Sequence, residues 1–142
     1  MKQKLILALT LMASGRAMTL AYIHRAGEGG LGDPPAAWLM PLVGDAVVGL
    51  TALLVFWLLW KWPIAKTWVI AVAWNAVAAF DAMGAYLVEI TAPWPEFFML
   101  EMVGRPMFFA ATAMHLFLIF LLTRPVILEH YGIDRRAVVC EA

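Results

Sequence analysis

Residues 38–60 read WLMPLVGDAVVGLTALLVFWLLW, an almost unbroken apolar run in which Asp45 is the only charged side chain. A helix of about 20 mainly apolar residues crosses the hydrocarbon core of a bilayer, so this run predicts a transmembrane helix. Other stretches of the chain have the same character. We expect spans at residues 5–23, 38–60, 68–90 and 104–123.

The composition favours a membrane protein throughout. The chain has 142 residues, of which 64% are hydrophobic and 14% are charged. Soluble domains average about 45–50% apolar and about 25% charged residues, and a soluble domain of this length has too little interior to bury so much apolar surface. We therefore predict an all-α, polytopic membrane protein, with a four-transmembrane-helix bundle in residues 1–125 and a cytoplasmic tail in residues 126–142.

Charge and cysteine content exclude several classes of protein. Ten Lys and Arg balance ten Asp and Glu, so no basic stripe is available for nucleic acid. Cys140 is the only cysteine, which excludes an intrachain disulfide and a thiolate metal site. His24, His115 and His130 fall at three different levels of the predicted topology. We expect no metal site, and the sequence identifies no cofactor.

The distribution of basic residues predicts the orientation. Lys and Arg are enriched in cytoplasmic loops, and an inner N-terminus places seven of them inside and two at the outer side. The inner group is Lys2, Lys4, Lys61, Lys66, Arg124, Arg135 and Arg136, and the outer group is Arg25 and Arg105. We expect both termini in the cytoplasm and a location in the cell membrane.

The N-terminus also has features of a signal peptide. Lys2 and Lys4 precede an apolar run, and small residues follow at positions 13–15, as at a cleavage site. The apolar character resumes after Arg16 and continues to Ile23. We therefore expect the first span to be retained, whereas a cleaved chain would keep three spans.

Aromatic residues near the span ends are expected to anchor the helices at the bilayer interface. They are Trp38, Trp60, Trp62, Trp68 and Trp94. The connection at residues 91–103 combines two prolines with aromatic and acidic residues, and we expect it to lie on the outer leaflet.

Six polar side chains fall inside the predicted spans: Arg16, Asp45, Asn75, Asp81, Arg105 and His115. A charge at the bilayer centre costs at least about 2.5–3.5 kcal/mol, so each of them needs a partner or a function. At a rise of about 1.5 Å per residue, Arg16, Asp45 and Asp81 lie about 10–12 Å below the outer edge on three different helices. Opposite charges stabilise one another in a low dielectric, and we predict that these three side chains meet inside the bundle.

The helix faces predict that further polar residues continue from this charged layer of Arg16, Asp45 and Asp81, so that together they form a polar column. Asp45 shares a face with Gly49, and small residues are typical of close helix contacts in membranes. Arg105 and His115 share a face of the fourth span, with His115 about 15 Å deeper and Asn75 approaching it from the third span. The candidate ligand-binding residues are Arg16, Asp45, Asn75, Asp81, Arg105 and His115, and the candidate catalytic residues are Asp45, Asp81 and His115.

The same residues have simpler interpretations. The charged layer could be an ion network that only fixes helix pairing. Arg105 could extend its charge to lipid headgroups, and Asn75 could make a hydrogen bond between helices. His115 could be a buried hydrogen-bonding group, or a single ligand of a pigment or haem.

Known catalytic motifs are absent from the sequence: it has no phosphate-binding loop, dinucleotide fingerprint, G-x-S-x-G, H-E-x-x-H or C-x-x-C. Residues 33–38 read DPPAAW and precede Asp45, a pattern that resembles the EXPERA family of membrane proteins. The resemblance implies a small helical bundle whose intramembrane acids contact a sterol-like or cationic amphiphilic ligand. Asp45 and Asp81 would then contact a protonated amine, or carry protons in an isomerisation.

Three functions are compatible with these features. The favoured one is a protein that binds a lipid-like, pigment or amphiphilic ligand, or that serves as an accessory subunit of a larger membrane complex. The second is an intramembrane isomerase-like enzyme of EXPERA type that uses the buried acids. The third is a small transporter or channel, which four helices would form as a homo-oligomer. The expected partners are the bilayer, a hydrophobic ligand and another membrane-protein chain.

Overall fold

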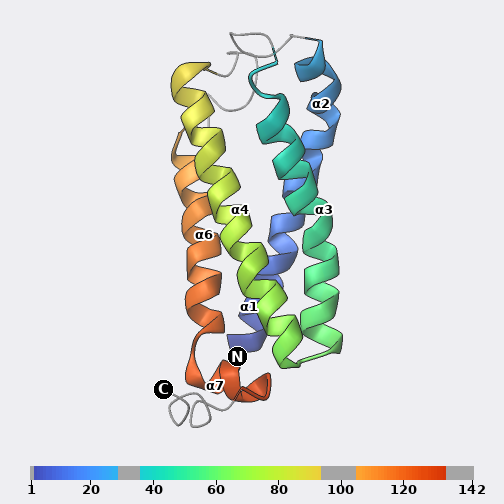
Figure 1. The fold of residues 1–142 in the computed structure, drawn as a ribbon, viewed down its shortest axis with the longest axis vertical. Helices are drawn as coiled ribbons and strands as arrows, with labels where there is room; N and C mark the ends of the chain where they lie inside the picture. Colours follow the sequence, from blue (N-terminus) through green and yellow to red (C-terminus); the bar gives the residue numbers. More distant parts are fainter. Residues whose placement is uncertain (1, 29–35, 94–104, 134–142) are drawn as a thin grey trace.

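A computed structural model gives the fold and describes residues 2–28, 36–93 and 105–133. These residues form helices and turns, with no strand among them, which confirms the predicted all-α class. Figure 1 shows the helices side by side, with a short helix across their lower end. The helices are α1 (Lys2–Met12), the 3₁₀ segment η1 (Ala13–Thr19), α2 (Leu20–Gly27), α3 (Leu39–Lys61), α4 (Ala65–Thr91), α6 (Pro106–Leu122) and α7 (Pro125–His130).

Within the described residues, three helices are long and apolar enough to cross a membrane. They are Gln3–Gly27, which joins α1, η1 and α2, and then Leu39–Lys61 and Ala65–Thr91. α6 is apolar but has 17 residues, and residue 104, where the fourth span is expected to begin, lies outside the described residues. Most of the proposed outer-leaflet connection, residues 33–35 of the DPPAAW pattern and the tail from residue 134, including Cys140, also lie outside them.

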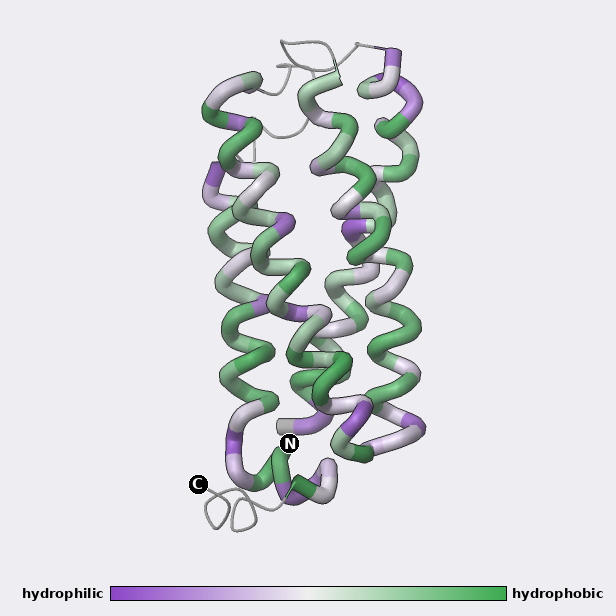
Figure 2. Tube along the Cα trace, viewed as in Figure 1, coloured by the Kyte–Doolittle hydropathy of each residue, from purple (hydrophilic) through white to green (hydrophobic). Residues whose placement is uncertain are grey.

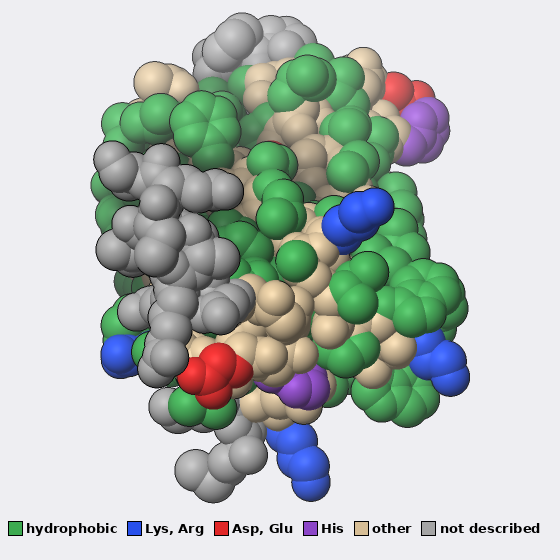
Figure 3. Space-filling view, turned by 60° about the horizontal axis from the view of Figure 1, so that its bottom comes forward, with side chains coloured by type: hydrophobic (Ala, Val, Ile, Leu, Met, Phe, Trp, Pro, Cys, Tyr) green, Lys and Arg blue, Asp and Glu red, His purple; other side chains and the backbone are tan. Residues whose placement is uncertain are grey.

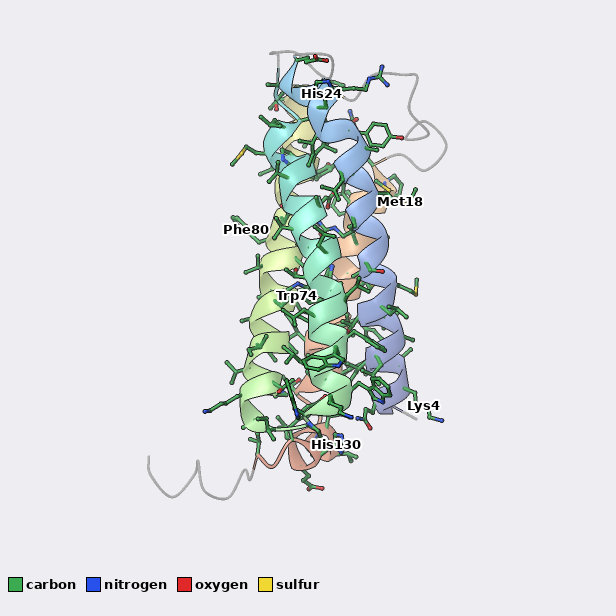
Figure 4. The ribbon with its side chains drawn as sticks, turned by 90° about the vertical axis from the view of Figure 1, so that its right-hand side faces the viewer. Lys4, Met18, His24, Trp74, Phe80 and His130 are labelled. Atoms are coloured by element: carbon green, nitrogen blue, oxygen red, sulfur yellow. The ribbon has the colours of Figure 1, made fainter. Side chains whose placement is uncertain are left out.

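The outward surface of the helices is apolar. The most exposed large hydrophobic residues are Phe80, Met18 and Met40, at 82%, 77% and 76% exposure. Figure 4 shows Phe80 and Met18 pointing away from the bundle, and Figure 2 shows hydrophobic residues along most of each helix. Because exposing this much apolar surface to water is unfavourable, lipid is the environment that suits it.

Proline positions explain several helix boundaries. Pro106 and Pro125 begin α6 and α7, and Pro41 is the third residue of α3. The first turn of a helix has backbone N–H groups without helical partners, so proline is tolerated there. α3 ends at Lys61, two residues before Pro63.

The first helix differs from the expected continuous α-helix. Residues Ala13–Thr19 form seven residues of 3₁₀ helix, whereas runs longer than about three or four residues are uncommon. The hydroxyl of Thr19 donates to the carbonyl oxygen of Arg16 at 2.8 Å or to that of Leu42 at 3.1 Å. Gly49 of α3 lies against this segment, and a Cβ there would overlap the backbone of Arg16 and Ala17. The 3₁₀ segment therefore lies where the first helix and α3 come into backbone contact.

Two apolar clusters form the core, one towards each end of the bundle. The lower cluster joins the first helix to α3, α4, α6 and α7 through Ile6, Val55, Leu59, Ala71, Leu118, Leu121, Leu122, Ile127 and Tyr131. The upper cluster consists of Ala26, Trp38, Leu42, Ala85 and Phe108. The indole of Trp38 donates to the carbonyl oxygen of Ala92 at 2.8 Å, which links the start of α3 to the end of α4.

The contact at Gly49 gives a test of this packing. Replacing Gly49 with Ala forces a methyl group into the backbone of η1, and overpacking of this kind costs about 1–3 kcal/mol. Gly15→Ala is the matched control, because a Cβ at Gly15 meets nothing within 4 Å. Unfolding in detergent should show a loss of stability for Gly49→Ala only, and equal effects of the two substitutions would contradict the close approach.

Candidate functional site

Arg16, on η1, lies at the centre of a polar layer between the two apolar clusters. Its Nε donates to Asp45 Oδ1 at 2.5 Å, and its Nη2 pairs with the same oxygen. Nη2 also donates to Asp81 Oδ2 at 2.5 Å. Nη1 donates to the carbonyl oxygen of Ala78 at 3.3 Å and faces His115 Nε2 at 3.4 Å. Four of these contacts are hydrogen bonds and the fifth is an ion pair, so each of the five N–H donors of the guanidinium faces an acceptor.

His115 and Asn75 continue the layer from α6 and α4. Both are buried, and His115 Nδ1 lies 2.9 Å from Asn75 Oδ1. Since Arg16 only donates, the imidazole must accept at Nε2 and donate from Nδ1, which requires the neutral ring. The amide nitrogen of Asn75 donates one of its two N–H groups to the carbonyl oxygen of Ala71 at 2.8 Å, which extends the hydrogen-bonded chain from Arg16 to the backbone of α4.

Small and aromatic residues surround the layer. Gly44 leaves room for Asp81, because a Cβ at Gly44 would overlap the Asp81 carboxylate. Trp74 packs edge-on against His115, with ring centroids 5.4 Å apart, and its indole donates to Thr51 Oγ1 at 2.9 Å. The sequence does not single out Trp74 or Thr51. The signal that could have found Trp74 is its position, six residues inside the predicted span 68–90, whereas the tryptophans identified as anchors lie near span ends.

The structure brings five of the six sequence-predicted residues together. The predicted contacts of Arg16 with Asp45 and Asp81 are present, as is the contact between Asn75 and His115. Arg105 does not join them: it is exposed, just before the first residue of α6. The helical rise places it about 15 Å from His115 along the helix axis.

The remaining histidines lie far from the layer. Figure 4 shows His24 and His130 at opposite ends of the molecule. Among the described residues, no group of three His, Cys, Asp or Glu side chains could hold a metal ion. His115 is fully buried with both ring nitrogens in contact, so neither nitrogen is free to bind a haem or pigment in this conformation.

In each aspartate of the layer, one of the two carboxylate oxygens contacts Arg16 and the other does not. Asp45 Oδ2 and Asp81 Oδ1 have no hydrogen-bond partner in the part of the chain that the structure describes. The side chains of Asp45 and Asp81 are 24% and 19% exposed. One guanidinium faces two carboxylates, so with both acids ionised the layer carries one excess negative charge.

Comparison with protein-family models, curated proteins and solved structures finds no match to this chain. The resemblance to the EXPERA family gains no support from these comparisons. Function must therefore be argued from the site itself.

The pairing of Arg16 gives a second prediction. Arg16→Met leaves two carboxylates in the layer without their cation, and breaking a buried pair in this way costs about 3–5 kcal/mol. Adding Asp45→Asn and Asp81→Asn to Arg16→Met should recover much of that stability, because no unpaired charge then remains. Unfolding of the variants in detergent provides the measurement.

Arg105→Met is the control for this series. Because Arg105 is exposed, its loss should change stability by less than about 0.5 kcal/mol. A triple variant as unstable as Arg16→Met alone would contradict the charge-pairing account.

Proposed function

We propose that this chain is a four-span protein of the cell membrane, with both termini in the cytoplasm, that binds a lipid-like or amphiphilic ligand. The polar group of the ligand would lie at Asp45 and Asp81. The observation that carries this proposal is the pair of carboxylate oxygens that have no partner among the described residues.

The length and position of α6 support a fourth span. Its 17 residues lie at the short end of the range of about 17–25 residues for transmembrane helices. It also packs along the length of α4 (Figure 1). A helix of this composition beside three candidate spans has its most favourable environment in the same bilayer.

The charges of the described residues support the orientation. The lower end in Figure 1, where α1 begins and α7 lies, carries four cations and one acid among the described side chains, which are Lys4, Lys61, Lys66, Arg124 and Glu129. The upper end carries two cations and two acids, which are Arg25, Arg105, Glu28 and Glu89. Figure 3, turned so that the lower end comes forward, shows the basic side chains spaced around a largely apolar surface. Excess positive charge marks the cytoplasmic side.

The chemistry of the layer favours a ligand with a hydrogen-bond donor. Arg16 has no N–H group left to offer, whereas Asp45 Oδ2 and Asp81 Oδ1 can each accept. An ammonium group would also balance the excess negative charge, which is costly in an apolar bundle. The apolar outer surface gives a membrane-dissolved molecule a route to this site.

The alternatives receive less support from the geometry. Acid–base chemistry by an isomerase could use Asp45 and Asp81, but His115 is buried away from any ligand at the exposed carboxylate edges. A transporter would need further chains, and an accessory subunit would need a partner. No observation singles out either of these.

The ligand proposal is tested by native mass spectrometry of the protein released from lipid nanodiscs. We expect a reproducible added mass that is reduced in Asp45→Asn and Asp81→Asn, because an amide NH₂ replaces the accepting oxygen. Gly84→Ala is the control, since a Cβ there meets nothing within 4 Å. A bare chain from the wild type would contradict ligand binding.

The topology is tested by labelling intact cells with a membrane-impermeant thiol reagent in a Cys140→Ser background. Glu28→Cys should be labelled from outside, because Glu28 is exposed at the end of the bundle opposite α7. Lys61→Cys, at the other end, should be labelled only after the membrane is opened. The reverse pattern would overturn the orientation.

A further inference from the structure

The turn between α3 and α4, with the helix ends beside it, carries three tryptophans and two lysines within residues 57–66. α3 ends at Lys61 and α4 begins at Ala65, so residues 62–64 make the whole connection. Trp60, Lys61, Trp62 and Lys66 are exposed around it. This turn lies at the same end of the bundle as the start of α1 and as α7 (Figure 1).

The indole groups at this turn differ from the other described tryptophans. Trp38, Trp68 and Trp74 donate their indole N–H groups to Ala92 O, Leu122 O and Thr51 Oγ1. Trp57, Trp60 and Trp62 donate to no described group, and they are 42%, 63% and 48% exposed. An indole with an apolar ring and a free N–H suits the boundary between acyl chains and headgroups.

Two of the rings at the turn contact each other, and the third lies near a phenylalanine ring. Trp57 packs edge-on against Trp62, with ring centroids 4.5 Å apart. The ring centroids of Trp60 and Phe56 are 6.3 Å apart. The backbone N–H of Trp62 donates to the carbonyl oxygen of Leu58 at 2.9 Å. The three indole donors therefore lie on the last turns of α3 and at the residue that follows it.

Two lysines add charge to these donors. Lys61 and Lys66 flank the turn, and neither has an ion pair among the described residues. The one acid described at this end is Glu129, which lies on α7. Free N–H donors beside two ammonium groups match a phosphate that bears a net negative charge.

We propose that the α3–α4 turn is a binding site for the headgroup of an anionic phospholipid. The phosphate accepts from the indole N–H groups and from Lys61 and Lys66, while the acyl chains lie along the apolar surface of α3 and α4. A zwitterionic headgroup brings its own ammonium towards the two lysines and binds less tightly. This site is separate from the polar layer and does not depend on a ligand there.

The test measures lipid binding to the full chain in detergent by native mass spectrometry. Phosphatidylglycerol and phosphatidylcholine with identical acyl chains are added at equal concentration, and the ratio of their apparent dissociation constants is determined. The wild type should prefer phosphatidylglycerol. Lys61→Gln and Lys66→Gln should each lower the preference about fivefold.

Two further variants separate the parts of the site. A triple variant with Trp57→Phe, Trp60→Phe and Trp62→Phe keeps an aromatic ring at each position and removes the indole N–H donors. It should weaken binding of both lipids. Arg105→Gln, at the opposite end, should leave the preference unchanged. Circular dichroism of each variant confirms retained helix.

The outcomes are decisive for the proposal. A lysine double variant with the wild-type preference would overturn it, and so would an equal loss of preference in Arg105→Gln. Inorganic phosphate at the same concentration should not displace the lipid, because it lacks the acyl chains. Displacement by phosphate would show a simple anion site instead.

Discussion

A positively charged guanidinium inside an apolar bundle is the constraint around which these helices are arranged. Burial of a lone charge is far more costly than burial of a paired one, so Arg16 must meet acceptors from several helices at once. Its acceptors are carboxylates on α3 and α4, a carbonyl oxygen on α4 and an imidazole nitrogen on α6. A single side chain thereby links the first helix to the other three long helices.

The backbone around Arg16 accommodates this arrangement. The 3₁₀ segment and Gly49 bring the first helix against α3, and Gly44 leaves space for the Asp81 carboxylate. Apolar clusters above and below separate the layer from both ends of the bundle. Each N–H group of Arg16 faces an acceptor and His115 donates to Asn75. Two carboxylate oxygens, in contrast, have no partner among the described residues, so the layer differs from a fully satisfied structural network. That imbalance is the basis of the proposal that the layer binds a ligand.

Much of this arrangement follows from sequence. Apolar runs locate the helices to within a few residues, and the helical rise places Arg16, Asp45 and Asp81 at one depth. Local pattern does not predict the 3₁₀ segment, because it accompanies a backbone contact with Gly49 on another helix. The same reasoning misses the indole of Trp74 against His115, which depends on how α4 and α6 are rotated. Arg105 shares a helix face with His115, but shared direction does not bring together groups separated along the axis.

The central claim is that Arg16 bridges Asp45 and Asp81 inside the bilayer. Solid-state NMR of the protein in lipid bilayers, with ¹⁵N-labelled Arg side chains and ¹³C-labelled Asp carboxyl groups, measures this bridge directly. The account predicts short nitrogen-to-carboxyl contacts to two aspartates, both of which disappear in Arg16→Met. A spectrum without these contacts, or one unchanged by Arg16→Met, would contradict it.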